Sequence, residues 1–213
     1  LFRSLKNLKQ KAAELLGALP ARPPGFCVGC PERPVFSAMK VLEKQSGKFH
    51  VSADIGCHLF STLPPFNIGN TVLGYGLGLA SNAAVQPMFG ERTVTIMGDG
   101  GFWHNGLTSG VANAVFNRDD GILLLMKNGY TSATGTQSIP SSPRPTEGKS
   151  RDMSIEKALQ GVGVEWLRKV YNYRVAEVAK TLREAMTTPF KGLKVIIADG
   201  ECQLARQRRV RAE

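Results

Sequence analysis

The chain has 213 residues, 42% of them hydrophobic, and a formal net charge of +10. This length suits one α/β domain, and the absence of any run of about 18 apolar residues excludes a membrane-spanning protein. The positive charge gathers near the two ends, without the interleaved aromatic residues of a nucleic-acid surface, so nucleic-acid binding is not expected. A docking surface for an acidic electron carrier or an acidic neighbouring domain fits this charge better.

The first 22 residues predict an amphipathic helix followed by a proline-rich connector. Leucines and alanines recur at helical spacing over residues 2–17, with lysines opposite them, and Gly17 ends the helix. Residue 1 is Leu, and no charged-then-apolar leader precedes the domain, so we expect the chain to be part of a longer protein. We divide it into residues 1–22, a main domain at 23–205 and a basic tail at 206–213.

The main domain alternates short apolar runs with helical patterns. Strands are predicted at 49–53, 93–97, 122–126, 164–170 and 193–198, and helices at 34–44, 71–85, 104–116, 155–161 and 175–186. This alternation predicts a doubly wound α/β fold, a mostly parallel sheet flanked by helices. Residues 60–67 and 131–149 are predicted loops, and the length of the second favours a functional role.

Two of the buried strands end on oxygen ligands. Asp99 follows the strand at 93–97, and Asn128 follows the strand at 122–126, so both should lie at the same edge of a parallel sheet. A carboxylate and an amide oxygen suit Mg²⁺ held together with phosphate oxygens. Gly98, Gly100 and Gly101 would let a diphosphate approach the backbone, and the helix expected to start near His104 would offer it free amides.

The four cysteines are Cys27, Cys30, Cys57 and Cys202. The Cys-x-x-Cys pair can direct two thiolates to one metal centre, which leaves disulfides, a zinc site and a 4Fe-4S cluster to be weighed. Cys57 and Cys202 each follow a predicted strand, as Asp99 and Asn128 do. This shared position favours a cluster beside the crevice.

Other side chains at this edge are candidates for ligand contact. His58 and His104 lie on the predicted rim and could touch a cofactor or substrate. Phe102 and Trp103 could shape an aromatic pocket, although core positions are more common for such residues.

Together these motifs resemble a known family. Gly98-Asp99-Gly100, answered by Lys127-Asn128 after residues 101–126, is similar to the thiamine-diphosphate motif, with lysine at the usual first asparagine. Combined with Cys27-Val-Gly-Cys30-Pro31 and Asp54-Ile-Gly-Cys57, it resembles the thiamine-binding domain of 2-oxoacid:ferredoxin oxidoreductases, closest to the indolepyruvate (arylpyruvate) members.

The resemblance implies roles for individual residues. Asp99, the Asn128 side chain and the Tyr130 carbonyl would bind Mg²⁺, and Thr134, within Thr134-Gly135-Thr136-Gln137, would lie beside thiamine diphosphate. The four cysteines would carry a 4Fe-4S cluster. No catalytic residue is assigned, because the activating glutamate is expected on a separate pyrimidine-binding domain or subunit.

The implied reaction is oxidative decarboxylation of an aryl 2-oxoacid to acyl-CoA and CO₂, with electrons passing to ferredoxin. The chain would be inactive alone, part of an oligomer and cytoplasmic. Two alternatives remain: a non-oxidative thiamine-dependent 2-oxoacid decarboxylase or synthase domain, and a zinc-stabilised all-cysteine interaction domain.

Overall fold

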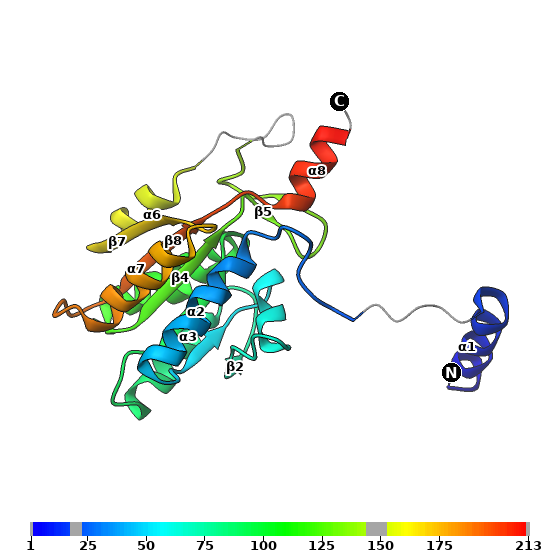
Figure 1. The fold of residues 1–213 in the computed structure, drawn as a ribbon, viewed down its shortest axis with the longest axis horizontal. Helices are drawn as coiled ribbons and strands as arrows, with labels where there is room; N and C mark the ends of the chain where they lie inside the picture. The colour runs from blue at the N-terminus through cyan, green and yellow to red at the C-terminus, as the bar shows by residue number, and fades with distance from the viewer. Residues whose placement is uncertain (1, 18–22, 144–152, 212–213) are drawn as a thin grey trace.

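Six strands form the central sheet of the computed structural model, which describes residues 2–17, 23–143 and 153–211. The strands are β1 (Val51–Ala53), β2 (Thr71–Val72), β3 (Val94–Gly98), β4 (Ile122–Lys127), β7 (Trp166–Tyr171) and β8 (Lys194–Asp199). All pairings are parallel, in the order β2-β1-β3-β4-β8-β7 (Figure 1). A separate antiparallel hairpin joins β5 (Tyr130–Thr131) to β6 (Gln137–Ser138).

Helices cover both faces of this sheet. On one face lie α2 (Glu32–Ser46) and α7 (Val175–Thr187). On the other lie α3 (Gly78–Val85), α6 (Ile155–Gly161) and one long helix made of α4 (Asp99–Gly101), the wide π-type η3 (Phe102–Ala112) and α5 (Asn113–Phe116). The remaining helices are α1 (Phe2–Leu16), α8 (Gln203–Arg211) and the short η1 (Cys57–Thr62) and η2 (Gln86–Met88). The predicted doubly wound α/β fold is confirmed.

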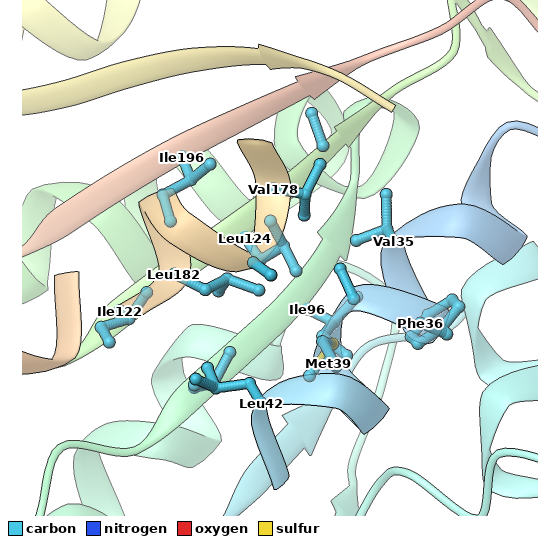
Figure 2. Close-up of a cluster of buried hydrophobic side chains, with 14 of the residues drawn as sticks. Val35, Phe36, Met39, Leu42, Ile96, Ile122, Leu124, Val178, Leu182 and Ile196 are labelled. Carbon is cyan, nitrogen blue, oxygen red and sulfur yellow. The ribbon is translucent and has the colours of Figure 1, made fainter. Parts of the chain in front are cut away.

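The central strands are apolar on both sides because each side packs against helices. Figure 2 shows Ile96, Leu124 and Ile196 of neighbouring strands meeting Met39 of α2 and Leu182 of α7, all fully buried. On the opposite face a second cluster includes Leu123, Leu125 and Ile197 of the sheet, packed with residues of α3, η3 and α6. These two cores fix the strand ends that carry the candidate site.

Two predicted helices have different bounds in the structure. Residues 71 and 72 form β2 instead of helix, pairing with Ser52 and Ala53, and the helix begins only at Gly78. Gly76 has a φ of +79°, which a right-handed helix does not contain, and this explains the late start.

The second helix begins at Asp99, not near His104. Glycines lowered the predicted helix propensity there, but close packing requires two of them. A Cβ on Gly101 would lie 2.5 Å from Asp54 Oδ2, and one on Gly106 would collide with the Met97 sulfur.

The two ends of the chain also differ from the main domain. In α1 the leucines are exposed, Leu15 by 85%, and Figure 1 shows the helix apart from the sheet. α8 crosses the predicted boundary between residues 205 and 206, and its residues are too uniformly polar to give a helical pattern in sequence. The division into 1–22, 23–205 and 206–213 stays a prediction, and residues 18–22 and 144–149 of the predicted connector and loop lie outside the described residues. In the described ranges, every helix is too short or too polar to cross a membrane.

A charged cluster joins strands and helix at the amino-terminal edge of the sheet. The Lys194 side chain is fully buried and its Nζ bonds to the Asp120 carboxylate and to the Asp120 carbonyl, the latter at 3.0 Å. Arg92 donates to Asp120 Oδ2 at 3.1 Å and to four backbone carbonyls at and beyond the end of α7. Burial alone would raise the pKa of Asp120, but hydrogen bonds from Lys194 and Arg92 outweigh it and lower the pKa to about 2.

Asp120→Asn is expected to lower the free energy of unfolding at pH 7 by about 2 kcal/mol. A fully buried pair would lose roughly 3–5 kcal/mol, but the Asp120 side chain is 25% exposed. Because the folded pKa lies below the ordinary 3.8, this stabilisation is present above pH 4 and is lost as the pH falls toward 2. Urea unfolding should show that the difference in unfolding free energy between Asp120→Asn and the parent is smaller at pH 2 than at pH 7. Asp119→Asn is the control. An unchanged difference would contradict this account.

Candidate cofactor and metal site

A cavity of about 200 Å³ opens at the carboxyl-terminal edge of the sheet. This is where the chain turns to opposite sides of the sheet after β1 and β3, a common place for ligands in doubly wound folds. The residues predicted to contact cofactor all line it: His58, Gly98, Asp99, Gly100, Gly101, Asn128, Tyr130 and Thr134. The structure therefore brings together residues from three separate segments, although their binding roles stay predictions.

Asp99 lies at the centre of this edge and is fully buried. Its Oδ2 accepts hydrogen bonds from the backbone N–H of Asn128 at 2.9 Å and of Gly129 at 2.6 Å, and its Oδ1 accepts from Gly100 N–H at 3.0 Å. Burial raises the pKa of Asp99 to about 7, against the lowering effect of these hydrogen bonds and of Lys127. A buried carboxylate that is costly to ionise is a fitting ligand for a divalent cation, which would favour its charged form.

Asn128 faces Asp99 from the neighbouring strand end. Its Oδ1 accepts from Tyr130 N–H at 3.1 Å and from Ser132 Oγ at 2.9 Å, while its Nδ2 donates to Glu32 Oε1 at 3.1 Å. The amide oxygen therefore lies on the side of Tyr130. The set of carboxylate, amide oxygen and peptide carbonyl suits Mg²⁺ by its chemistry.

Two buried polar atoms in the cavity wall have no hydrogen-bond partner among the described residues: His58 Nε2 and Glu32 Oε2. Burial lowers the pKa of His58 to about 4, while a hydrogen bond to the Asp54 backbone acts against this, so the ring is neutral at pH 7. Burial raises the pKa of Glu32 to about 8; the Asn128 hydrogen bond opposes this rise and the Asp99 charge adds to it. A polar ligand in the cavity would supply the hydrogen-bond partner that each of these two atoms lacks.

Close packing around Gly100 also leaves no room for a larger residue. A Cβ on Gly100 would lie 2.5 Å from Thr131 Oγ1 and would also collide with the Tyr75 hydroxyl. Tyr75 lies in the loop before α3 and Thr131 in β5, and their hydroxyls share a hydrogen bond of 3.0 Å across the site. Protein packing alone thus requires glycine at position 100, in addition to the predicted approach of a diphosphate.

The four cysteines line one small cavity of about 40 Å³. Cys30 N–H donates to the Cys27 carbonyl at 3.1 Å in a tight turn, and Cys202 N–H donates to the Asn128 carbonyl at 3.1 Å. Burial raises the pKa of Cys30 to about 12, with a further rise from the nearby Glu32, and burial raises that of Cys57 as well. Within residues 2–17, 23–143 and 153–211, no three histidine, cysteine or acidic side chains already form a metal-ligating group.

The cysteine cavity and the larger cavity share part of their walls. Glu32, Cys57, Asn128 and Ser132 line both. Anything bound between the cysteines would therefore be separated from a ligand of the larger cavity by single side chains. The two cavities are adjacent, and the cluster expected between the cysteines stays a prediction.

Three other sequence candidates lie elsewhere. Phe102 is fully buried in the core, and Trp103 donates from Nε1 to Ser141 Oγ at 2.8 Å. His104 is exposed, with its ring centroid 5.0 Å from that of Tyr75. None of the three lines the described cavity.

Sequence analysis missed Glu32, Tyr75 and Thr131 as wall residues. Glu32 is the first residue of α2, directly after the Cys-x-x-Cys-Pro turn. An acidic residue in this position ordinarily stabilises the helix through its dipole. Its closeness to two predicted ligand cysteines was the available signal.

A family match identifies the chain as a thiamine-diphosphate-binding domain. Residues 54–198 match the family model described as thiamine pyrophosphate enzyme, C-terminal TPP binding domain, thiamine pyrophosphate being another name for thiamine diphosphate. The chain belongs to this family, which confirms the resemblance predicted from sequence.

Curated relatives carry a more specific description. The chain is 28% identical over 224 residues to "Indolepyruvate oxidoreductase subunit IorA" of Pyrococcus horikoshii, covering 99% of this chain and 34% of that protein. It is 28% identical over 192 residues to the subunit of the same name from Methanothermobacter thermautotrophicus, covering 88% and 31%. The chain thus spans about a third of the length of these relatives.

A solved structure shares the fold. The 2-oxoglutarate:ferredoxin oxidoreductase from Magnetococcus marinus superposes with a TM-score of 0.73 at 19% identity, covering 86% of this chain and 66% of that chain. This likeness supports the doubly wound α/β architecture.

Proposed function

We propose that this chain is the thiamine-diphosphate and Mg²⁺ binding, iron–sulfur-bearing part of an oxidoreductase that converts an aryl 2-oxoacid of the indolepyruvate type to acyl-CoA and CO₂. Ferredoxin would receive the electrons. Family membership supports the thiamine part, and the names of the curated relatives support a 2-oxoacid oxidoreductase. The observation that carries the iron–sulfur part is the wall shared by the cysteine cavity and the larger cavity.

The residues present fit Mg²⁺ and a diphosphate. Asp99 would supply the anionic oxygen, with the Asn128 amide oxygen and the Tyr130 carbonyl as further ligands. The helix begins at Asp99 in the cavity wall, where the positive end of its dipole would favour negative charge. Thr134 lines the outer side of the same cavity.

When bound, thiamine diphosphate supplies the nucleophilic carbon that cleaves 2-oxoacids, and a 4Fe-4S cluster supplies a one-electron acceptor. The chain's own residues would bind and orient these groups and would exclude water from them. His58, neutral and with Nε2 unpartnered in the cavity wall, would accept a hydrogen bond from the bound cofactor or substrate. The four cysteine thiolates would hold the cluster.

The site is incomplete for thiamine chemistry without a second domain. No acidic side chain here is assigned to the pyrimidine ring, so a pyrimidine-binding domain or subunit of the same enzyme would supply the activating glutamate. Coenzyme A and the 2-oxoacid would enter between this chain and that pyrimidine-binding domain or subunit. An oligomeric, cytoplasmic enzyme follows as part of the same proposal.

The test is anaerobic purification followed by counting iron, acid-labile sulfide and zinc per chain. We expect about four iron and about four sulfide with no stoichiometric zinc, because four thiolates ligate one 4Fe-4S cluster. Stoichiometric zinc without iron would overturn the iron–sulfur part. A zinc-stabilised interaction domain is already disfavoured, since it required the Gly98-Asp99-Gly100 match to be accidental.

The second candidate is a non-oxidative thiamine-dependent decarboxylase or synthase domain. It predicts a colourless protein that binds thiamine diphosphate and contains no iron after anaerobic preparation. The convergence of all four cysteines on one cavity favours the oxidative function.

A further inference from the structure

Glu32 is an unusual residue to find at this depth. It is the first residue of α2 and is 1% exposed, although carboxylates are rarely buried without a partner. Its Oε1 accepts a hydrogen bond from Asn128 Nδ2 at 3.1 Å, and no lysine or arginine forms an ion pair with it in the described residues. The structure keeps a costly buried carboxylate in contact with one amide.

That amide is the one expected to ligate a cation. An asparagine side chain can present either its oxygen or its nitrogen in nearly the same volume, and the hydrogen-bond network decides which. Whether Glu32 is ionised or carries a proton on its unpartnered Oε2, its Oε1 is an acceptor and can pair only with the Nδ2 donor of the amide. With Nδ2 held by Glu32, Oδ1 must point the other way, toward Tyr130 N–H and Ser132 Oγ.

We propose that Glu32 is a positioning residue for the cation site, holding the Asn128 amide so that its oxygen faces the metal. This inference rests on the proposed function and adds a role for Glu32 that the sequence pattern did not reveal. Glu32 acts through Asn128 and is not itself a metal ligand. Partners of this kind typically account for 10–100-fold in metal affinity.

The alternative orientation shows why such a device is useful. If the amide turned over, Oδ1 would face the Glu32 carboxyl oxygen and Nδ2 would face the Tyr130 N–H. Two acceptors would then meet at one end of the amide and two donors at the other. Without Glu32, Tyr130 N–H would oppose the flip of the Asn128 amide only at its oxygen end. Glu32 opposes it from the other end and also fixes the amide in place at the base of the cavity.

The test measures Mn²⁺ affinity in the presence of thiamine diphosphate, from the free Mn²⁺ EPR signal of the anaerobic holoenzyme. Glu32→Met fills a similar volume but accepts no hydrogen bond from Asn128, and its affinity should fall 10–100-fold. Glu32→Gln keeps an acceptor oxygen and should remain within about threefold of the parent. Glu43→Gln, on the same helix and away from the cavity, is the matched control.

The possible results distinguish a failure of the positioning role of Glu32 from a failure of the proposed function. Parent-like affinity in Glu32→Met would overturn the positioning role, and so would an equal loss in Glu32→Met and Glu32→Gln, since charge would then be the cause. Glu32→Ala replaces Glu32→Met if the latter does not fold, with the same expectation. If the parent itself binds no Mn²⁺ with thiamine diphosphate, the proposed function fails instead.

Discussion

Asp99→Asn is expected to abolish cofactor binding, lowering the affinity for Mn²⁺ with thiamine diphosphate by at least about 100-fold. Asp99 is the sole carboxylate among the proposed cation ligands, so the variant removes the charge that a hard divalent ion needs. It also replaces one acceptor oxygen with an NH₂ group, so either the hydrogen bond from Gly100 N–H to Oδ1 or those from Asn128 N–H and Gly129 N–H to Oδ2 are lost. The loss should exceed that of Glu32→Met, because a ligand is removed and not its support.

The measurement is titration calorimetry of Mn²⁺ into protein with saturating thiamine diphosphate. Asp119→Asn, at the opposite edge of the sheet, is the control and should bind as the parent does. Melting temperatures without cofactor identify any variant that fails to fold. Parent-like binding by a folded Asp99→Asn would remove the basis for the cation site.

Cys202→Ser is expected to remove iron while leaving the cofactor cavity intact. Cys202 is 8% exposed and lines the cysteine cavity, but not the larger one. Losing one of four thiolates should reduce iron from about four per chain to below about one, with loss of the brown colour. Binding of Mn²⁺ with thiamine diphosphate should stay within about threefold of the parent.

Cys57→Ser provides the informative contrast, because Cys57 lines both cavities. It should lose iron to the same extent and also weaken cofactor binding. Gln203→Ala is the control, since Gln203 lines the cysteine cavity without being a predicted ligand. Full iron content in anaerobically purified Cys202→Ser would exclude this thiol as a ligand.

The sheet was predictable because its strands are short apolar runs bounded by turns. The β4 and β8 strands are buried on both faces, and such runs can be read directly from sequence. The edge strand β2 was not predictable, since two residues carry no periodic pattern and the glycines that follow them suggested close helix packing. α8 was missed for the opposite reason, because its arginines give no apolar face.

The candidate site was predictable wherever a residue directly follows a strand. Asp99 and Asn128 meet because parallel strands carry their carboxyl ends to one edge. Glu32 enters from a helix start more than sixty positions before Asp99, and its contact with Asn128 depends on how α2 packs on the sheet. Side-chain partners set by packing between layers leave no local signal in the sequence.

The central claim is that a cation–cofactor site and a cysteine-held cluster share one wall of this domain. Anomalous diffraction from anaerobic crystals grown with Mn²⁺ and thiamine diphosphate, collected at the manganese and iron edges, tests it most directly. The account predicts manganese in contact with Asp99 and Asn128, and iron enclosed by Cys27, Cys30, Cys57 and Cys202. Manganese bound elsewhere, or a cysteine cavity without iron, would contradict it.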